Sequence, residues 1–83
     1  MTLLYFAWLR QKIGRSEESM ARPPGVATVA DLIAHLKRRG AGYADAFADE
    51  SRIRIAVNQR HHRLDAPVAD ADEVAFFPPV TGG

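Results

Sequence analysis

The residues best placed to do chemistry are the two glycines on which the sequence ends, Gly82 and Gly83. They follow an apolar run and two prolines, in the segment Val74-Ala-Phe-Phe-Pro-Pro-Val-Thr-Gly-Gly83. Glycine has no Cβ, so these two residues can pass where no other residue fits. Pro78 and Pro79 fix φ and donate no N–H, so we expect strand pairing to end at Phe77. The pattern predicts a tail that enters the active site of another protein; the alternative is a frayed terminus.

The predicted tail could carry a reactive group at its end. A terminal carboxylate is ionised at neutral pH and is therefore a poor electrophile. Activation as an acyl-adenylate would give it a leaving group, which a sulfur donor could displace to leave a thiocarboxylate. Such a carrier needs no cysteine, and the chain has none. Fully extended, the tail would span roughly 20 Å; its residues are Pro78, Pro79, Val80, Thr81, Gly82 and Gly83.

No other group of residues makes a convincing catalytic or metal site. We interpret the three histidines as solvated side chains; they are His35, His61 and His62. His61 and His62 are adjacent, so on a strand their side chains would point to opposite faces. A cluster of carboxylates lies in expected turns and lacks the spacing of a metal site. We therefore expect no metal and no catalytic residue in this chain. The carboxylates are Asp65, Asp70, Asp72 and Glu73.

Length and composition limit the remaining possibilities. The chain has 83 residues, enough for one domain, and a net charge of +1, which predicts neither nucleic-acid nor membrane binding. We find no run of about 18 apolar residues and no signal-peptide pattern, so we expect a cytoplasmic protein. We interpret the basic segments of the chain as solvated surface, or as groups that steer an acidic partner or an anionic substrate toward the protein. These segments are Lys37-Arg38-Arg39 and the arginines at 52, 54, 60 and 63.

The patterns predict strands at both ends of the chain and one main helix between them. Residues 3–9 form an apolar run typical of a strand covered on both faces, residues 9–14 suggest a helical turn, and residues 17–21 suggest an edge strand. Thr28 and Asp31 predict a helix start, residues 29–36 carry one apolar stripe, and Gly40 is expected to follow the helix end. Tyr43 and Phe47, four apart, indicate a second short helix.

The second half of the chain is expected to be mostly β. Alternation predicts a strand over residues 53–57, a turn at Asn58-Gln59, a return strand over 60–64 and a last strand over 73–77. A long helix lying across one face of a small mixed sheet is an α+β roll, with the apolar first and last strands at the sheet centre. We divide the chain into a domain of residues 1–77 and a tail of residues 78–83.

The chain resembles a known family, the small subunits of molybdopterin synthase, which are sulfur carriers of molybdenum-cofactor biosynthesis. The resemblance is strongest at Asp72-Glu-Val-Ala-Phe-Phe-Pro-Pro-Val-Thr-Gly-Gly83. It is supported by the aromatic first strand ending in Arg10 and by Ala56-Val-Asn-Gln59. It covers essentially the whole chain and implies a ubiquitin-like β-grasp fold. Two positions depart from the family pattern, Ala71 where glycine is common and His61 where an apolar contact is expected.

The resemblance also implies a function and a set of partners. An E1-like adenylyltransferase would use ATP to adenylate Gly83, and a sulfur-relay enzyme would convert the adenylate to a thiocarboxylate. The large synthase subunit would then take in the tail, and sulfur would pass to cyclic pyranopterin monophosphate. The complex would be a heterotetramer of two small and two large subunits, in which this chain is a non-catalytic sulfur donor without a stably bound cofactor. The docking surface would include Phe6, Phe77, Arg10 and His61.

Two alternatives remain open. One is a related carrier for thiamine thiazole synthesis or protein tagging, which would share the fold and the two glycines. The other is a β-grasp interaction module whose tail is inert. An RNA-binding module is a more distant third reading of the basic segments.

Overall fold

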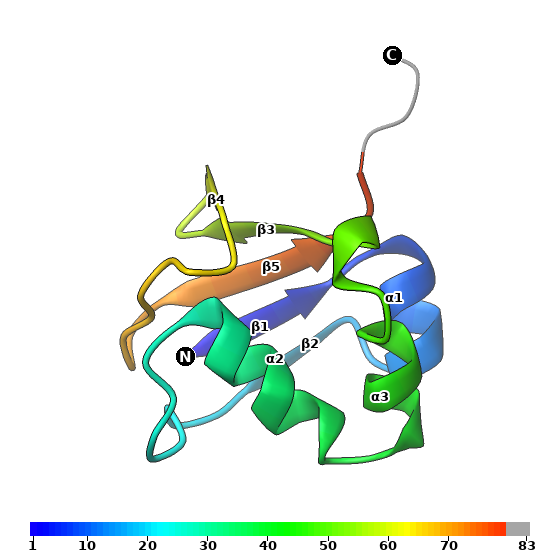
Figure 1. Cartoon of the computed structure of the whole chain (residues 1–83), viewed down its shortest axis with the longest axis horizontal. Helices are drawn as coiled ribbons and strands as arrows, with labels where there is room; N and C mark the ends of the chain where they lie inside the picture. Colours follow the sequence, from blue (N-terminus) through cyan, green and yellow to red (C-terminus); the bar gives the residue numbers. More distant parts are fainter. Residues whose placement is uncertain (80–83) are drawn as a thin grey trace.

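The computed structural model describes residues 1–79, and a five-stranded mixed sheet runs through them (Figure 1). The strands lie in the order β2-β1-β5-β3-β4, with β1 and β5 parallel and the other neighbouring pairs antiparallel. The first and last strands therefore lie at or next to the centre, as the sequence predicts. The strands are β1 Thr2–Tyr5, β2 Glu17–Ser19, β3 Arg54–Val57, β4 Arg60–His62 and β5 Glu73–Phe77.

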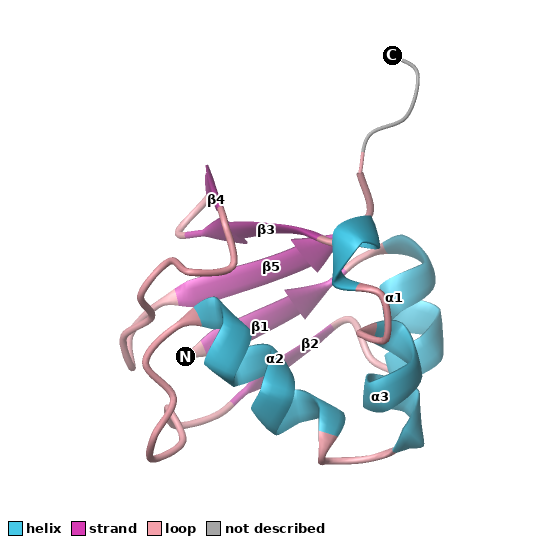
Figure 2. Ribbon diagram, viewed as in Figure 1, coloured by secondary structure: helices cyan, strands magenta, loops and turns pink. Residues whose placement is uncertain are grey.

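The helices gather on one side of the sheet (Figure 2). They are α1 Ala7–Ile13, α2 Val29–Lys37 and α3 Ala41–Ala46, followed by a 3-10 turn, η1, at Glu50–Arg52. The main helix α2 begins as predicted, because Thr28 and Asp31 form a reciprocal capping box. Its apolar stripe is buried against the sheet and consists of Val29, Leu32, Ile33 and Leu36.

Strand alternation gives the sheet one covered face and one open face. Along β1 and β5, the side chains that point toward the helices are fully buried, namely Leu3, Tyr5, Val74 and Phe76. The residues between them, such as Leu4 and Ala75, are only half-buried. Aromatic rings fill the core, with Phe76 stacked on Tyr5 at 5.8 Å between centroids and edge-on to Phe47 at 5.1 Å. The α+β roll is confirmed.

Four predictions about element limits were wrong. The apolar run over residues 3–9 is not one strand: β1 ends at Tyr5, the backbone of Ala7 has a φ of 55°, and Leu9 reaches the core from α1. Gly40 does not close α2, because Arg38 caps that helix in a right-handed conformation and Gly40 precedes α3. The strands expected over 17–21 and 60–64 end early, at Ser19 and His62, which are the last residues of β2 and β4 that pair with the neighbouring strand.

The predicted turns are present. Asn58 and Gln59 have φ values of 52° and 68°, the left-handed pair that a two-residue hairpin requires. Gly14 closes α1 with a φ of 91°. Ala71 is not among the non-glycine residues with positive φ within residues 1–79, so alanine carries no backbone penalty in that turn. No helix in the described part of the chain is both long and apolar enough to span a membrane.

Candidate functional site

The open face of the sheet presents a flat row of small and apolar residues. Leu4 of β1 pairs with Ala75 of β5, Ala75 pairs with Ala56 of β3, and Ala56 pairs with His61 of β4. Leu4 and the two alanines are half-buried, whereas His61 is exposed. In residues 1–79 no helix lies on this face, so the row meets solvent.

Two phenylalanines stand at one end of this row, where β5 finishes. Phe6 follows β1, and its N–H donates to the Phe76 carbonyl at 3.1 Å, which places it beside Phe77. Phe6 is 48% exposed, and among the described residues it is the exposed large apolar side chain. The His61 ring lies edge-on to Phe77 at 5.5 Å between centroids. The structure therefore places Phe6 next to Phe77 through the backbone pairing and brings the His61 ring against Phe77.

The other predicted site residues lie around or beyond the end of β5. Arg10 is exposed on α1, one helical turn after Ala7, and no aromatic or cation–π contact joins it to the two phenylalanines. Pro78 and Pro79 are half-buried and follow β5 directly, so strand pairing ends at Phe77 as expected. Val80, Thr81, Gly82 and Gly83 lie outside the described residues, so the division into domain 1–77 and tail 78–83 stays a prediction.

A surface hollow of about 390 Å³ lies beside β3 and β4. Its apolar lining comes from Ile53, Ile55 and Leu64, and its polar lining from Glu50, Arg54, His62 and Arg63. Lys37 pairs with Glu50 at 3.6 Å. Within residues 1–79, His, Asp and Glu side chains do not gather in a group of three that could hold a metal ion.

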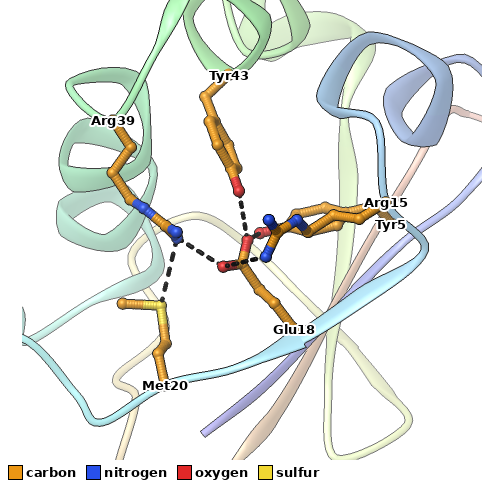
Figure 3. A network of polar contacts seen from close by, with 6 residues as sticks. All are labelled: Tyr5, Arg15, Glu18, Met20, Arg39 and Tyr43. Carbon is orange, nitrogen blue, oxygen red and sulfur yellow. Dashed lines mark hydrogen bonds and ion pairs between the residues drawn. The ribbon is translucent and has the colours of Figure 1, made fainter.

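A polar network on the covered side ties the edge strand β2 to the helices (Figure 3). The side chain of Glu18 is only 6% exposed and accepts hydrogen bonds from the hydroxyls of Tyr5 and Tyr43, each at 2.7 Å. Arg39 donates to the other carboxylate oxygen at 2.7 Å, and Arg15 lies 3.4 Å from that oxygen. Sequence reasoning missed this network, although alternation along β2 could have placed Glu18 on the same face as its partner Leu3.

The charges in this network are mutually stabilised. Burial alone would raise the pKa of Glu18, but the hydrogen bonds from Tyr43, Arg39 and Tyr5 outweigh it and lower that pKa. Burial, and then the hydrogen bond to Glu18, raises the pKa of Tyr5. The Arg39 guanidinium also lies over the Tyr43 ring at 5.0 Å. Every oxygen of the Glu18 carboxylate is occupied by these donors, so the network holds the fold together and offers no free base.

Comparisons with known proteins agree across the whole chain. The model of the ThiS family matches residues 3–83. The chain is 40% identical to the molybdopterin synthase sulfur carrier subunit of Escherichia coli strain K12 over 81 residues, covering 98% of this chain and 96% of that protein. It is 35% identical to the subunit of the same name from Haemophilus influenzae over 83 residues, covering 100% of this chain and 99% of that one.

Solved structures support the fold. The small archaeal modifier protein 1 of Haloferax volcanii superimposes with a TM-score of 0.73 at 28% identity, covering 96% of this chain and 97% of that chain. Together with the mixed sheet and its helices, this similarity confirms the expected ubiquitin-like β-grasp fold.

Proposed function

The chain belongs to the ThiS family, as a molybdopterin synthase sulfur carrier subunit, and we propose that it carries sulfur as a thiocarboxylate on Gly83. The observation that carries the proposal is the family match, which runs to Gly83 through the segment Phe77-Pro-Pro-Val-Thr-Gly-Gly83. The chain itself contributes the carboxylate and the surface that docks it; the catalytic groups belong to its partners.

The proposed chemistry runs in two steps on the terminal carboxyl group. A carboxylate oxygen of Gly83 attacks the α-phosphate of ATP on an E1-like adenylyltransferase, which forms the acyl-adenylate and releases pyrophosphate. A hydrosulfide ion supplied by a sulfur-relay enzyme then attacks the acyl carbon and displaces AMP, and loss of the S–H proton leaves the thiocarboxylate. No cysteine is required in the carrier, and the sequence contains none.

The sulfur acceptor is proposed to be cyclic pyranopterin monophosphate, bound by the large synthase subunit. Two carriers would deliver the two sulfurs of one dithiolene, and water would return each Gly83 to a carboxylate. We propose a heterotetramer of two small and two large subunits. A short, small-residue tail fits this role because it can follow a narrow channel into a partner's active site.

We propose that the carrier docks through the end of the open face where Phe6, Phe77 and His61 lie together. An exposed phenylalanine is costly for a monomer and is a common interface anchor. Pro78 follows this patch directly, so a partner that covers the two rings also receives the tail. Arg10, on the neighbouring helix α1, is proposed to contribute at the rim.

A second candidate function, protein tagging, is favoured by the similarity to the small archaeal modifier protein 1. Tagging would use the same adenylation of Gly83 but would transfer the chain to an amine. The two functions differ in their product: sulfur transfer leaves a free carrier, whereas tagging leaves the chain conjugated to the amine.

The test is the intact mass of the untagged protein after incubation with ATP, its adenylyltransferase and a sulfur source. A gain equal to replacing one oxygen by sulfur, mapped to Gly83, is the expected result. Deleting Gly83, or adding one residue after it, should abolish the gain while circular dichroism reports an unchanged fold. An unchanged mass, with the enzymes active on a control carrier, would refute the proposal.

A further inference from the structure

Two arginines lie near the end of β5, where the chain leaves the sheet, and a third is exposed on the neighbouring helix α1. Arg54 begins β3 and is the cross-strand partner of Phe77. Arg52 ends η1, and its guanidinium lies 5.2 Å from the ring centroid of Trp8, two residues after Phe6. Arg10 lies one helical turn beyond Ala7 on α1. We call Arg10, Arg52 and Arg54 the exit collar; all three are exposed.

The exit collar is not neutralised by the chain's own acids within residues 1–79. The four ion pairs there engage Lys12, Arg15, Lys37 and Arg39, all directed toward the helix side, and none includes a collar arginine. Two acids lie next to these arginines: Asp49, one of whose carboxylate oxygens accepts hydrogen bonds from the hydroxyl and N–H of Ser51, and Glu50, which pairs with Lys37. The collar therefore presents its positive charge to whatever approaches the tail.

Three acids gather at the beginning of β5, whereas arginines accompany Asp49 and Glu50 at its end. The acids Asp70, Asp72 and Glu73 lie at the beginning of this strand, and the exit collar lies at its end. In Figure 1 the β5 arrow runs from the first group toward the point where the chain leaves the sheet.

The two new members of the collar are held in place before any partner binds. Trp8 supports the Arg52 guanidinium, and the Arg54 guanidinium donates to the carbonyls of Ser51 at 3.3 Å and Ile53 at 3.2 Å. A guanidinium that is already positioned can bind a carboxylate through two hydrogen bonds at a small entropic cost. The hollow beside β3 also includes Arg54, so an acidic residue there would have an apolar recess next to it.

We propose that the surface around the tail-accepting channel of the large synthase subunit is acidic, and that Arg52 and Arg54 bind carboxylates on it. The inference rests on the proposed function and adds the chemistry of the partner's surface. Electrostatic complementarity of this kind mainly increases the association rate and orients the encounter, here with the tail leading.

The test measures the association rate constant of the carrier with the large subunit by stopped-flow fluorescence at two salt concentrations. Arg54→Glu and Arg52→Glu should each slow association roughly tenfold at low salt. The difference from wild type should shrink at about 0.5 M salt, where the Debye length is only a few ångströms. Arg38→Glu is the matched control, because it makes the same charge change on an exposed residue at the end of α2.

The outcomes separate this inference from the function on which it rests. Normal binding by the wild type, with equal rates for Arg54→Glu and Arg38→Glu, would overturn the exit collar and leave the sulfur-carrier function intact. A wild type that gains sulfur on Gly83 but binds a labelled single-stranded RNA more tightly than the large subunit, with that binding lost in Arg54→Glu, would assign the collar to RNA instead. Failure of the wild type to gain sulfur or to bind the large subunit would overturn both proposals.

Discussion

Replacing Glu18 with glutamine should destabilise the fold, and the size of the effect follows from the network in Figure 3. Glutamine keeps the shape of the side chain but turns one of its two acceptor atoms into a donor. In the native protein one carboxylate oxygen accepts from Tyr5 and Tyr43 and the other from Arg39, each at 2.7 Å. Either orientation of the amide thus directs an NH₂ group at a donor.

The cost is about that of one charge-assisted hydrogen bond in a site that water scarcely reaches. The Glu18 side chain is 6% exposed, so the loss should be roughly 2 kcal/mol in the free energy of unfolding. For a domain of 83 residues this corresponds to a fall in Tm of about 10 °C. Glu17→Gln is the control, since it makes the same charge change next along β2 at an exposed side chain.

The pH dependence gives an independent check on the same reasoning. Because hydrogen bonds hold the folded pKa of Glu18 below the unfolded value of about 4.3, the stabilisation is complete above that pH and is lost as pH falls through the folded pKa. The difference in Tm between wild type and Glu18→Gln should therefore be largest near neutral pH and shrink below about pH 4. Equal melting of Glu18→Gln and Glu17→Gln at pH 7, or a difference that persists unchanged in acid, would refute the argument.

Two further substitutions test packing and docking. Gly42→Ala should destabilise by about 1–3 kcal/mol despite the better helix propensity of alanine, because its Cβ would collide with the Lys12 carbonyl oxygen. Thermal melts check this against Gly40→Ala, whose Cβ would meet nothing closer than 4.0 Å, and equal melting would contradict it. Phe77→Ala should raise the Kd for the large synthase subunit roughly thirtyfold, the loss of about 2 kcal/mol typical of an interface anchor. Titration calorimetry measures this, and an unchanged Kd would remove Phe77 from the proposed docking surface.

Sequence patterns predicted the elements whose signals are local. Thr28 and Asp31 marked the start of α2 because a capping box depends on residues three apart, and Asn58 marked a hairpin turn because it tolerates positive φ. The apolar run over residues 3–9 was assigned wholly to a strand, because a buried strand and a short buried helix have the same composition. A strand and a helix are distinguished at this point only by the folded structure, in which Leu9 is buried in the core.

The site required contacts that no local pattern contains. Glu18 looked like an exposed residue of a polar edge strand, and its partners Tyr5, Arg39 and Tyr43 come from three other parts of the chain. In the same way, Arg52 and Arg54 seemed to belong to a dispersed basic surface. Their position around the end of β5 follows from the antiparallel pairing of β3 with β5, which sequence alone does not give.

We propose that one face of the sheet serves stability and the other serves docking. The nine residues of α2 span only about 13 Å, enough to cover one face of the central strands, and the polar network of Glu18 reinforces the edge of that same side. On the other face, Ala56 and Ala75 keep the surface flat, so that Phe6 and Phe77 project beside the point where the chain leaves the sheet. A central strand in a parallel pair is ordinarily covered on both sides. In this protein the chain covers one side of β5, and a partner that covers the other side would at the same time receive the residues that follow Phe77.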